Sequence, residues 1–205
     1  MENLYEVPEV FAEMAGHPEG LASIIEQMPV EPFAPNMEVQ AEMIAREYYE
    51  IPDLQYENWV ELSADERVAA MQQLEDKIAI IEMRDPFTIR TEAMDAAGSC
   101  SYSERLISIN TDRLMNNSRE LYLDNLDTLF HEGRHAYQHY NLDIRRTEQS
   151  NELVDGWYLN LKEMQYDNGD RLFMHRQGLC AYMAQPVEYD ARVFAEKCVQ
   201  ALNIA

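Results

Sequence analysis

The chain has 205 residues, which is enough for one ordinary domain or for a domain with an N-terminal arm. A hydrophobic fraction of 46%, with 12 Tyr and 12 Met, exceeds that of a disordered chain and predicts a sizeable buried core. The 38 acidic residues outnumber the 16 basic ones, and the net charge of -22 would repel phosphate groups, so nucleic acid and anionic membranes are excluded as expected partners.

The cysteines and the N-terminus indicate where the protein resides. Cys100, Cys180 and Cys198 form no CxxC pair and no even-numbered set, so neither a disulfide scaffold nor a thiolate zinc site is expected. The N-terminus lacks a basic segment followed by an apolar one, and no run of about 18 apolar residues occurs. We therefore expect a protein that is cytoplasmic, or secreted without a classical signal peptide, with no membrane partner. The sequence does not predict an oligomeric state.

The chain divides by composition into an N-terminal arm and one domain. Residues 1–36 hold five of the eight prolines and show no sustained apolar period, which predicts an arm or linker. Two apolar clusters of this arm, Val10-Phe11 and Ile24-Ile25, are candidates for packing either on the domain or on a partner. Residues 37–205 carry the periodic segments and are expected to form the domain.

The domain is expected to begin with two helices. Apolar residues at helical intervals predict the first over residues 37–50, and Pro52 then ends the pattern. The second is expected over residues 63–84, because Ser63 and Glu66 have the spacing of a capping box at its start.

A small sheet and further helices follow. Short β-branched segments predict strands over residues 87–90 and 105–110, with Gly98-Ser99 as a turn between them. The helices are expected over 117–140, where Asn117 and Glu120 make a second capping pair, near 146–167, near 170–184, and from Pro186 onward. This order of elements, with helices before and after a small sheet, predicts an α+β fold that is mostly helical.

The candidate chemistry lies in residues 131–135, which read His-Glu-Gly-Arg-His within the longest predicted helix. Four residues of an α-helix make little more than one turn, so His131 and His135 lie on one face and can reach one cation. Glu132 points about 100° away from His131, outside the ligand set but close to where the reacting water of a zinc enzyme sits. The pattern predicts one zinc ion per chain, with Glu132 as the catalytic base.

A catalytic zinc usually has three protein ligands, so a later side chain must complete the set. Glu188 is the expected third ligand, because Ala191 and Ala195 follow it at helical spacing and let its helix approach the histidine helix closely. His139 continues the same face but lies too far along a straight helix to bind the same ion. The remaining candidates are Glu148, Glu152 and Asp155.

Residues 129–138, followed later by residues 186–195, resemble the small gluzincin-type HExxH metallopeptidases. In pattern they are similar to ImmA/IrrE-like peptidases and to metallopeptidase-like domains of bacterial polymorphic toxins, in which an HExxH helix is paired with a later glutamate. The resemblance implies a zincin-like domain that is a zinc metallopeptidase. It implies the metal ligands His131, His135 and Glu188 and the general base Glu132.

Three further features of a peptidase site are expected near this cluster. Residues 106–110 match the strand that borders the cleft in such families, where an edge strand would hold an extended peptide by main-chain hydrogen bonds. Tyr182 is the first candidate for stabilising the oxyanion, because it shortly precedes the Glu188 helix. The other candidates are Tyr137, His175 and Tyr189. Arg134 is expected either to be exposed and paired with an acid or to grip a substrate carboxylate.

These patterns predict a zinc-dependent hydrolase, specifically a peptidase acting on a peptide or protein, in which Glu132 takes a proton from water and passes it to the leaving amine. One alternative is a catalytically silent zinc-site module with a binding or regulatory role. Another is a helical interaction domain in which the motif arises by chance. Cys100 is not expected to be a nucleophile, because Gly-Ser segments between strands are usually turns.

Overall fold

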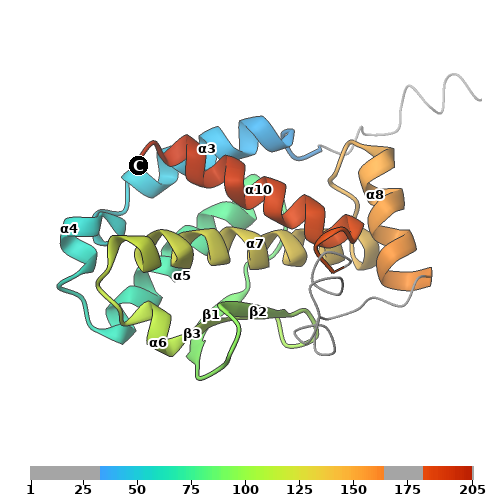
Figure 1. Cartoon of the computed structure of the whole chain (residues 1–205). Helices are drawn as coiled ribbons and strands as arrows, with labels where there is room; N and C mark the ends of the chain where they lie inside the picture. The colour runs from blue at the N-terminus through green and yellow to red at the C-terminus, as the bar shows by residue number, and fades with distance from the viewer. Residues whose placement is uncertain (1–32, 164–181, 205) are drawn as a thin grey trace, which may run out of the picture. The chain divides into compact units, whose positions relative to one another are not determined.

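Helix α7, Arg119–Asp143, is the central element of the domain, with helices and a small sheet packed around it (Figure 1). The structure, a computed structural model, describes residues 33–163 and 182–204. The chain divides into two units, Met1–Pro32 and Phe33–Ala205, and the described residues belong to the second. No helix among the described residues is long and apolar enough to span a membrane.

The domain begins a few residues before position 37. Ala34 is 1% exposed, and its backbone N–H donates to the carbonyl of Thr147 at 2.9 Å. Residues 33–36, which composition assigns to the arm, are therefore part of the folded unit. Residues 1–32 lie outside the described part of the chain, so the arm itself stays a prediction.

The first helices form where the sequence predicts them. Helix α3, Met37–Tyr49, is capped by Asn36, whose side chain accepts a hydrogen bond from the N–H of Val39. Helix α5, Ala64–Ile81, begins with both hydrogen bonds of the predicted Ser63–Glu66 capping box. Between them lie two short elements that no pattern in the sequence predicts: the 3-10 helix η1, Pro52–Leu54, and helix α4, Tyr56–Trp59.

The sheet differs from its prediction in two ways. Strands β1, Thr88–Glu92, and β3, Leu106–Asn110, are present and pair in parallel, but β2, Gly98–Ser101, stands where a turn was expected and pairs antiparallel with β3. The order β1-β3-β2 makes β3 the central strand, and all five of its residues are buried. The expectation of an edge strand at residues 106–110 is therefore wrong, and β2 takes the outer position beside α7.

The remaining helices complete an α+β, mostly helical fold, as predicted. Ser118 caps α7 instead of Asn117, whose side-chain oxygen accepts a hydrogen bond from Arg67. The predicted 146–167 helix begins later, and its last four residues lie outside the described part, as does the 170–184 helix except for residues 182–184. The elements are α6, Thr111–Leu114; α8, Asn151–Tyr158, continued by the π-helix η2, Leu159–Glu163; and α10, Pro186–Leu202.

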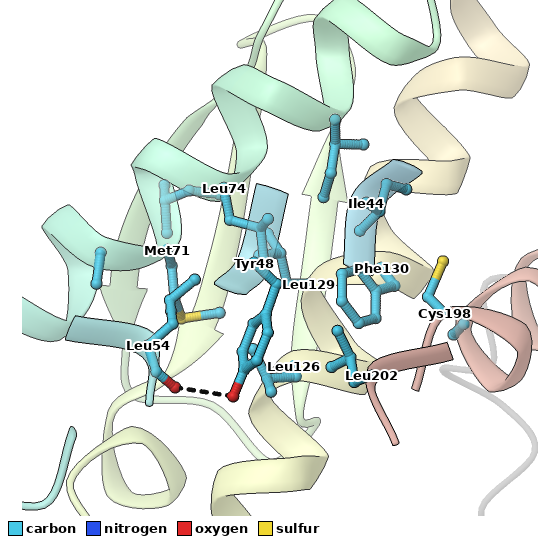
Figure 2. Close-up of a cluster of buried hydrophobic side chains, with 14 of the residues drawn as sticks. Ile44, Tyr48, Leu54, Met71, Leu74, Leu126, Leu129, Phe130, Cys198 and Leu202 are labelled. Atoms are coloured by element: carbon cyan, nitrogen blue, oxygen red, sulfur yellow. Dashed lines mark hydrogen bonds between the residues drawn. The ribbon is translucent and has the colours of Figure 1, made fainter. Parts of the chain in front are cut away.

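One apolar core holds α7 and α10 in place. Leu126, Leu129 and Phe130 of α7 are at most 1% exposed, as the apolar spacing before the motif predicts. Figure 2 shows them beside Cys198 and Leu202 of α10 and beside a group from the first helices: Ile44, Tyr48, Leu54, Met71 and Leu74. The Tyr48 hydroxyl donates to the Leu54 carbonyl at 3.1 Å, so its buried polar atom is satisfied. This core fixes the two helices that carry the candidate site.

Candidate metal centre

His131 and His135 face each other on one side of α7. Their Nε2 atoms are 3.1 Å apart, and their ring planes meet at 83°. Leu129 and Phe130 lie on another face of the helix and are buried in the core, so the face with the two histidines points away from the core. The two histidine side chains remain 19% and 14% exposed, so solvent reaches the cluster from one side.

Glu188 completes the cluster from the first turn of α10. Its Oε2 lies 3.4 Å from His131 Nε2, and its Oε1 lies 3.5 Å from His135 Nε2. Ala191 and Ala195 are at most 1% exposed in the same helix, which packs closely along α7. The small-residue stripe thus lies where the close approach of the two helices requires it. The structure brings the three predicted ligands together, and no other such group occurs within residues 33–163 and 182–204.

The donor set fits a zinc ion. Two imidazole nitrogens and one carboxylate are ligands that zinc prefers, and three protein ligands leave a fourth coordination position. A tetrahedral zinc with bonds of about 2.0 to 2.1 Å needs ligand atoms roughly 3.4 Å apart. The separations of 3.1, 3.4 and 3.5 Å in this cluster are close to that value. The cluster therefore has the atoms and the spacing to hold the ion.

Glu132 lies beside the cluster, against the outer strand β2. Its Cγ would be 3.4 Å from a Cβ atom built on Gly98. Burial raises the pKa of Glu132, His135 and His131 oppose this shift, and Glu188 reinforces it. A carboxyl group with a raised pKa is a stronger base than a solvated one, which suits a group that removes a proton from water.

The surroundings of His135 favour the protonated form of its ring when no metal is bound. Burial lowers the pKa of this histidine. Its hydrogen bond to Glu188 and the charges of Glu132 and Glu188 raise the pKa by more than burial lowers it, and the net result is a pKa of about 9. At neutral pH the ring is therefore cationic between two carboxylates. A histidine must be neutral to bind a metal, so a bound cation has to displace this proton.

Zinc binding is consequently expected to depend on pH. Below about pH 9 each ion that binds should displace one proton from His135, so the apparent affinity should rise about tenfold per pH unit up to that value and then level off. Calorimetric titration in two buffers of different ionisation enthalpy measures the protons released. An affinity that levels off near pH 6.5, the ordinary histidine pKa, would contradict the prediction.

The other predicted ligands are placed elsewhere. Glu152 and Asp155 are exposed on α8. Glu148 is buried, where it accepts hydrogen bonds from the Tyr137 hydroxyl and the Ser150 N–H. The His139 ring stacks on Tyr102, with ring centroids 4.7 Å apart, and its Nδ1 lies 3.5 Å from Asp143. None of these four belongs to the cluster.

The candidates for oxyanion stabilisation also differ in their positions and exposure. Tyr182 is half-buried in a short helical segment before α10, and its carbonyl accepts a hydrogen bond from the N–H of Gln185. Its catalytic role stays a prediction. Tyr137 is fully buried with its hydroxyl bonded to Glu148, so it cannot reach a substrate. Tyr189 is 59% exposed, and His175 lies outside the described residues.

Arg134 is not at the surface, contrary to its expected exposure. Its side chain is 0% exposed, and its Nε and Nη2 donate to the two oxygens of Asp190 at 2.9 and 3.2 Å. Glu82 and Glu148 approach it at 3.9 and 3.8 Å. Three aromatic rings also pack against the guanidinium, from Tyr137, Trp157 and Phe194. Arg134 is therefore paired with an acid, as expected, but it is buried, and its enclosed guanidinium is not open to a substrate carboxylate.

Cys100 lies in strand β2 and not in the expected turn, and its surroundings do not favour a reactive thiolate. Burial raises the pKa of its thiol, and the charge of Glu132 adds to the shift. The thiol therefore stays protonated at neutral pH and is a poor nucleophile. Cys198 is fully buried in α10, and Cys180 lies outside the described residues.

Gly98 allows β2 to approach α7. A Cβ atom at this position would lie 2.5 Å from Thr128 Cγ2 and 2.9 Å from the Ser108 carbonyl oxygen. Gly98→Ala should therefore lower the free energy of unfolding by about 1 to 3 kcal/mol, the usual cost of overpacking. Urea unfolding of the metal-free protein measures this loss.

Gly133 is the matched control. A Cβ atom there would meet Arg84 Nη2 at 3.5 Å and Glu75 Oε2 at 3.7 Å, which are ordinary contact distances. Gly133→Ala should leave stability unchanged or raise it by up to about 1 kcal/mol, because alanine favours a helix. Equal losses in the two variants would show that the strand is not held tightly against α7.

Comparison with known proteins adds no relative to this picture: no family model matches the chain, and neither a curated protein nor a solved structure matches it. A function for this chain must therefore be argued from the HExxH motif and from the geometry of the cluster.

Proposed function

We propose that the chain is a zinc-dependent hydrolase, specifically a peptidase of the HExxH type, that binds one zinc ion per molecule. The observation that carries the proposal is the convergence of His131, His135 and Glu188, whose facing atoms are 3.1 to 3.5 Å apart. Glu132 stands next to this trio without being part of it. A cluster built only to hold an ion has no need of that fourth group, which supports catalysis over a silent site.

The chain's own residues supply proton transfer and binding. When bound, zinc supplies Lewis acidity, which favours ionisation of water and polarisation of a carbonyl. Glu132 accepts a proton from the attacking water and returns it to the leaving amine. His131, His135 and Glu188 would hold the ion, while the outer strand β2 beside Glu132 offers an edge for an extended peptide. This edge is the reason for proposing a peptide or protein substrate.

Zinc content per molecule tests the proposal. Protein purified without added metal, or incubated with one equivalent of zinc, should hold close to one ion by elemental analysis. His131→Ala and Glu188→Gln should each weaken zinc binding by more than the ~100-fold that loss of an outer partner causes. Asp155→Asn, the alternative ligand exposed on α8, should bind zinc like the parent.

Two results would reject this assignment. If the parent binds no zinc even after incubation, the hydrolase proposal fails and a helical binding protein remains. If Glu188→Gln keeps its zinc while Asp155→Asn loses it, the third ligand comes from α8.

A further inference from the structure

Gln138 links the two helices that carry the cluster. It lies one turn after His135 on α7 and is 0% exposed. Its Oε1 lies 2.9 Å from His135 Nδ1. Its Nε2 donates to the Val187 carbonyl at 2.9 Å and to Asp190 Oδ2 at 2.8 Å, both in the first turns of α10. One buried side chain thus contacts a ligand of α7 and the backbone immediately before Glu188.

The partners of Gln138 fix the direction of its amide. The Val187 carbonyl only accepts hydrogen bonds, and Asp190 has both oxygens engaged by the guanidinium of Arg134, so it too acts as an acceptor. The NH2 group of Gln138 must therefore face α10. Its oxygen then faces His135, and because that oxygen can only accept, the His135 Nδ1 must carry the hydrogen.

We infer that Gln138 is a positioning residue that holds the His135 ring with Nδ1–H bonded to its own amide oxygen and with Nε2 directed at Glu188. This inference deepens the proposed function, since a ring held in this way presents Nε2 to a metal. Groups that hold the outer nitrogen of a histidine ligand commonly contribute 10- to 100-fold to metal affinity. The bond to Val187 should also keep Glu188 in register with the histidines.

A second buried glutamine provides a matched control. Gln40 of α3 is also 0% exposed, and its Oε1 accepts a hydrogen bond from Arg134 Nη1 at 3.4 Å. It therefore belongs to the same buried polar region but contacts neither the cluster nor α10 in any hydrogen bond of the described residues. Gln40→Met and Gln138→Met remove the same amide from equally buried positions. Only the second should change the metal site.

The first readout is zinc affinity, measured by competition with a chromophoric chelator. Gln138→Met should bind zinc about 10- to 100-fold more weakly than the parent, and Gln40→Met should bind it like the parent. The visible spectrum of the cobalt-substituted proteins should change only for Gln138→Met, because a freed ring alters the ligand geometry. Equal zinc affinity in the parent and Gln138→Met, or equal losses in the two variants, would overturn the inference.

The second readout needs no metal. A slowly exchanging Nδ1–H proton of His135, assigned with His135→Ala, should appear in the NMR spectrum of the metal-free parent and of Gln40→Met. It should be absent from Gln138→Met. If the parent lacks this proton, the inference is overturned whether or not zinc binds, and whether or not Gln138→Met folds. If the parent shows the proton but binds no zinc, the hydrogen bond is established and the proposed hydrolase function alone fails.

Discussion

Glu132→Gln is expected to lower the rate of peptide hydrolysis by about 10²- to 10⁴-fold while one zinc ion per molecule is retained. Glutamine has the same shape as glutamate but cannot accept a proton from water. Because Glu132 is outside the trio of donor atoms, its loss should leave the ion in place. Hydrolysis of a quenched fluorescent peptide library, measured beside elemental zinc content, separates these two effects.

Asp127→Asn is the matched control. Asp127 lies one turn before His131 on the same helix, and its charge interacts with that histidine, so it is another acid near the cluster. Glu132, and not Asp127, is among the three nearest neighbours of a Cβ atom built on Gly98 of β2, and removal of the Asp127 charge should leave most of the rate. Undiminished hydrolysis in Glu132→Gln would reject Glu132 as the base. Zinc bound by a parent that hydrolyses no peptide would instead favour the silent binding module.

Local signals explain which parts of the fold the sequence predicts well. Asn36 and the Ser63–Glu66 pair lie next to the residues they cap, so the starts of α3 and α5 depend on a few neighbouring side chains. Strand β2 is different, because Gly98–Ser101 has the composition of a turn. It is a strand because β3 pairs with it and α7 leaves room only for a glycine at position 98. These are tertiary contacts, and a short stretch of sequence does not reveal them.

The candidate site likewise has residues that local spacing predicts and residues that only tertiary contacts bring into place. His131 and His135 could be paired from sequence, because four residues of helix fix their relation. Glu188 lies more than 50 residues later, and the alanine stripe on α10 was the only local sign of its position. The role of Gln138 was missed, although its spacing of three residues from His135 is a signal that could have indicated a contact. Arg134 gave no such signal, because its acidic partners come from three separate segments of the chain.

Arg134→Met is expected to lower the free energy of unfolding by about 3 to 5 kcal/mol, the usual loss when one partner of a buried ion pair is removed. Methionine would fill part of the space but would leave the carboxylates of Asp190, Glu82 and Glu148 without this cation. Arg90→Met is the control, because the Arg90–Glu92 pair is about half exposed and should contribute at most about 1 kcal/mol. Urea unfolding in the presence of a chelator measures both without any contribution from zinc.

The loss in Arg134→Met should also grow as the pH rises. Burial raises the pKa of Glu82 to about 7, while the charges of Arg84 and Arg134 lower it. Between the ordinary carboxyl pKa and about 7 the folded state therefore holds more protons than the unfolded state, and stability falls as the pH rises through that range. Without Arg134 the pKa of Glu82 should rise further, which extends this fall to higher pH. A loss that is the same at pH values well below and well above 7 would mean that Arg134 does not stabilise the domain through the charge of Glu82, and would leave its bonds to Asp190 and its contacts with the aromatic rings as the source of the loss.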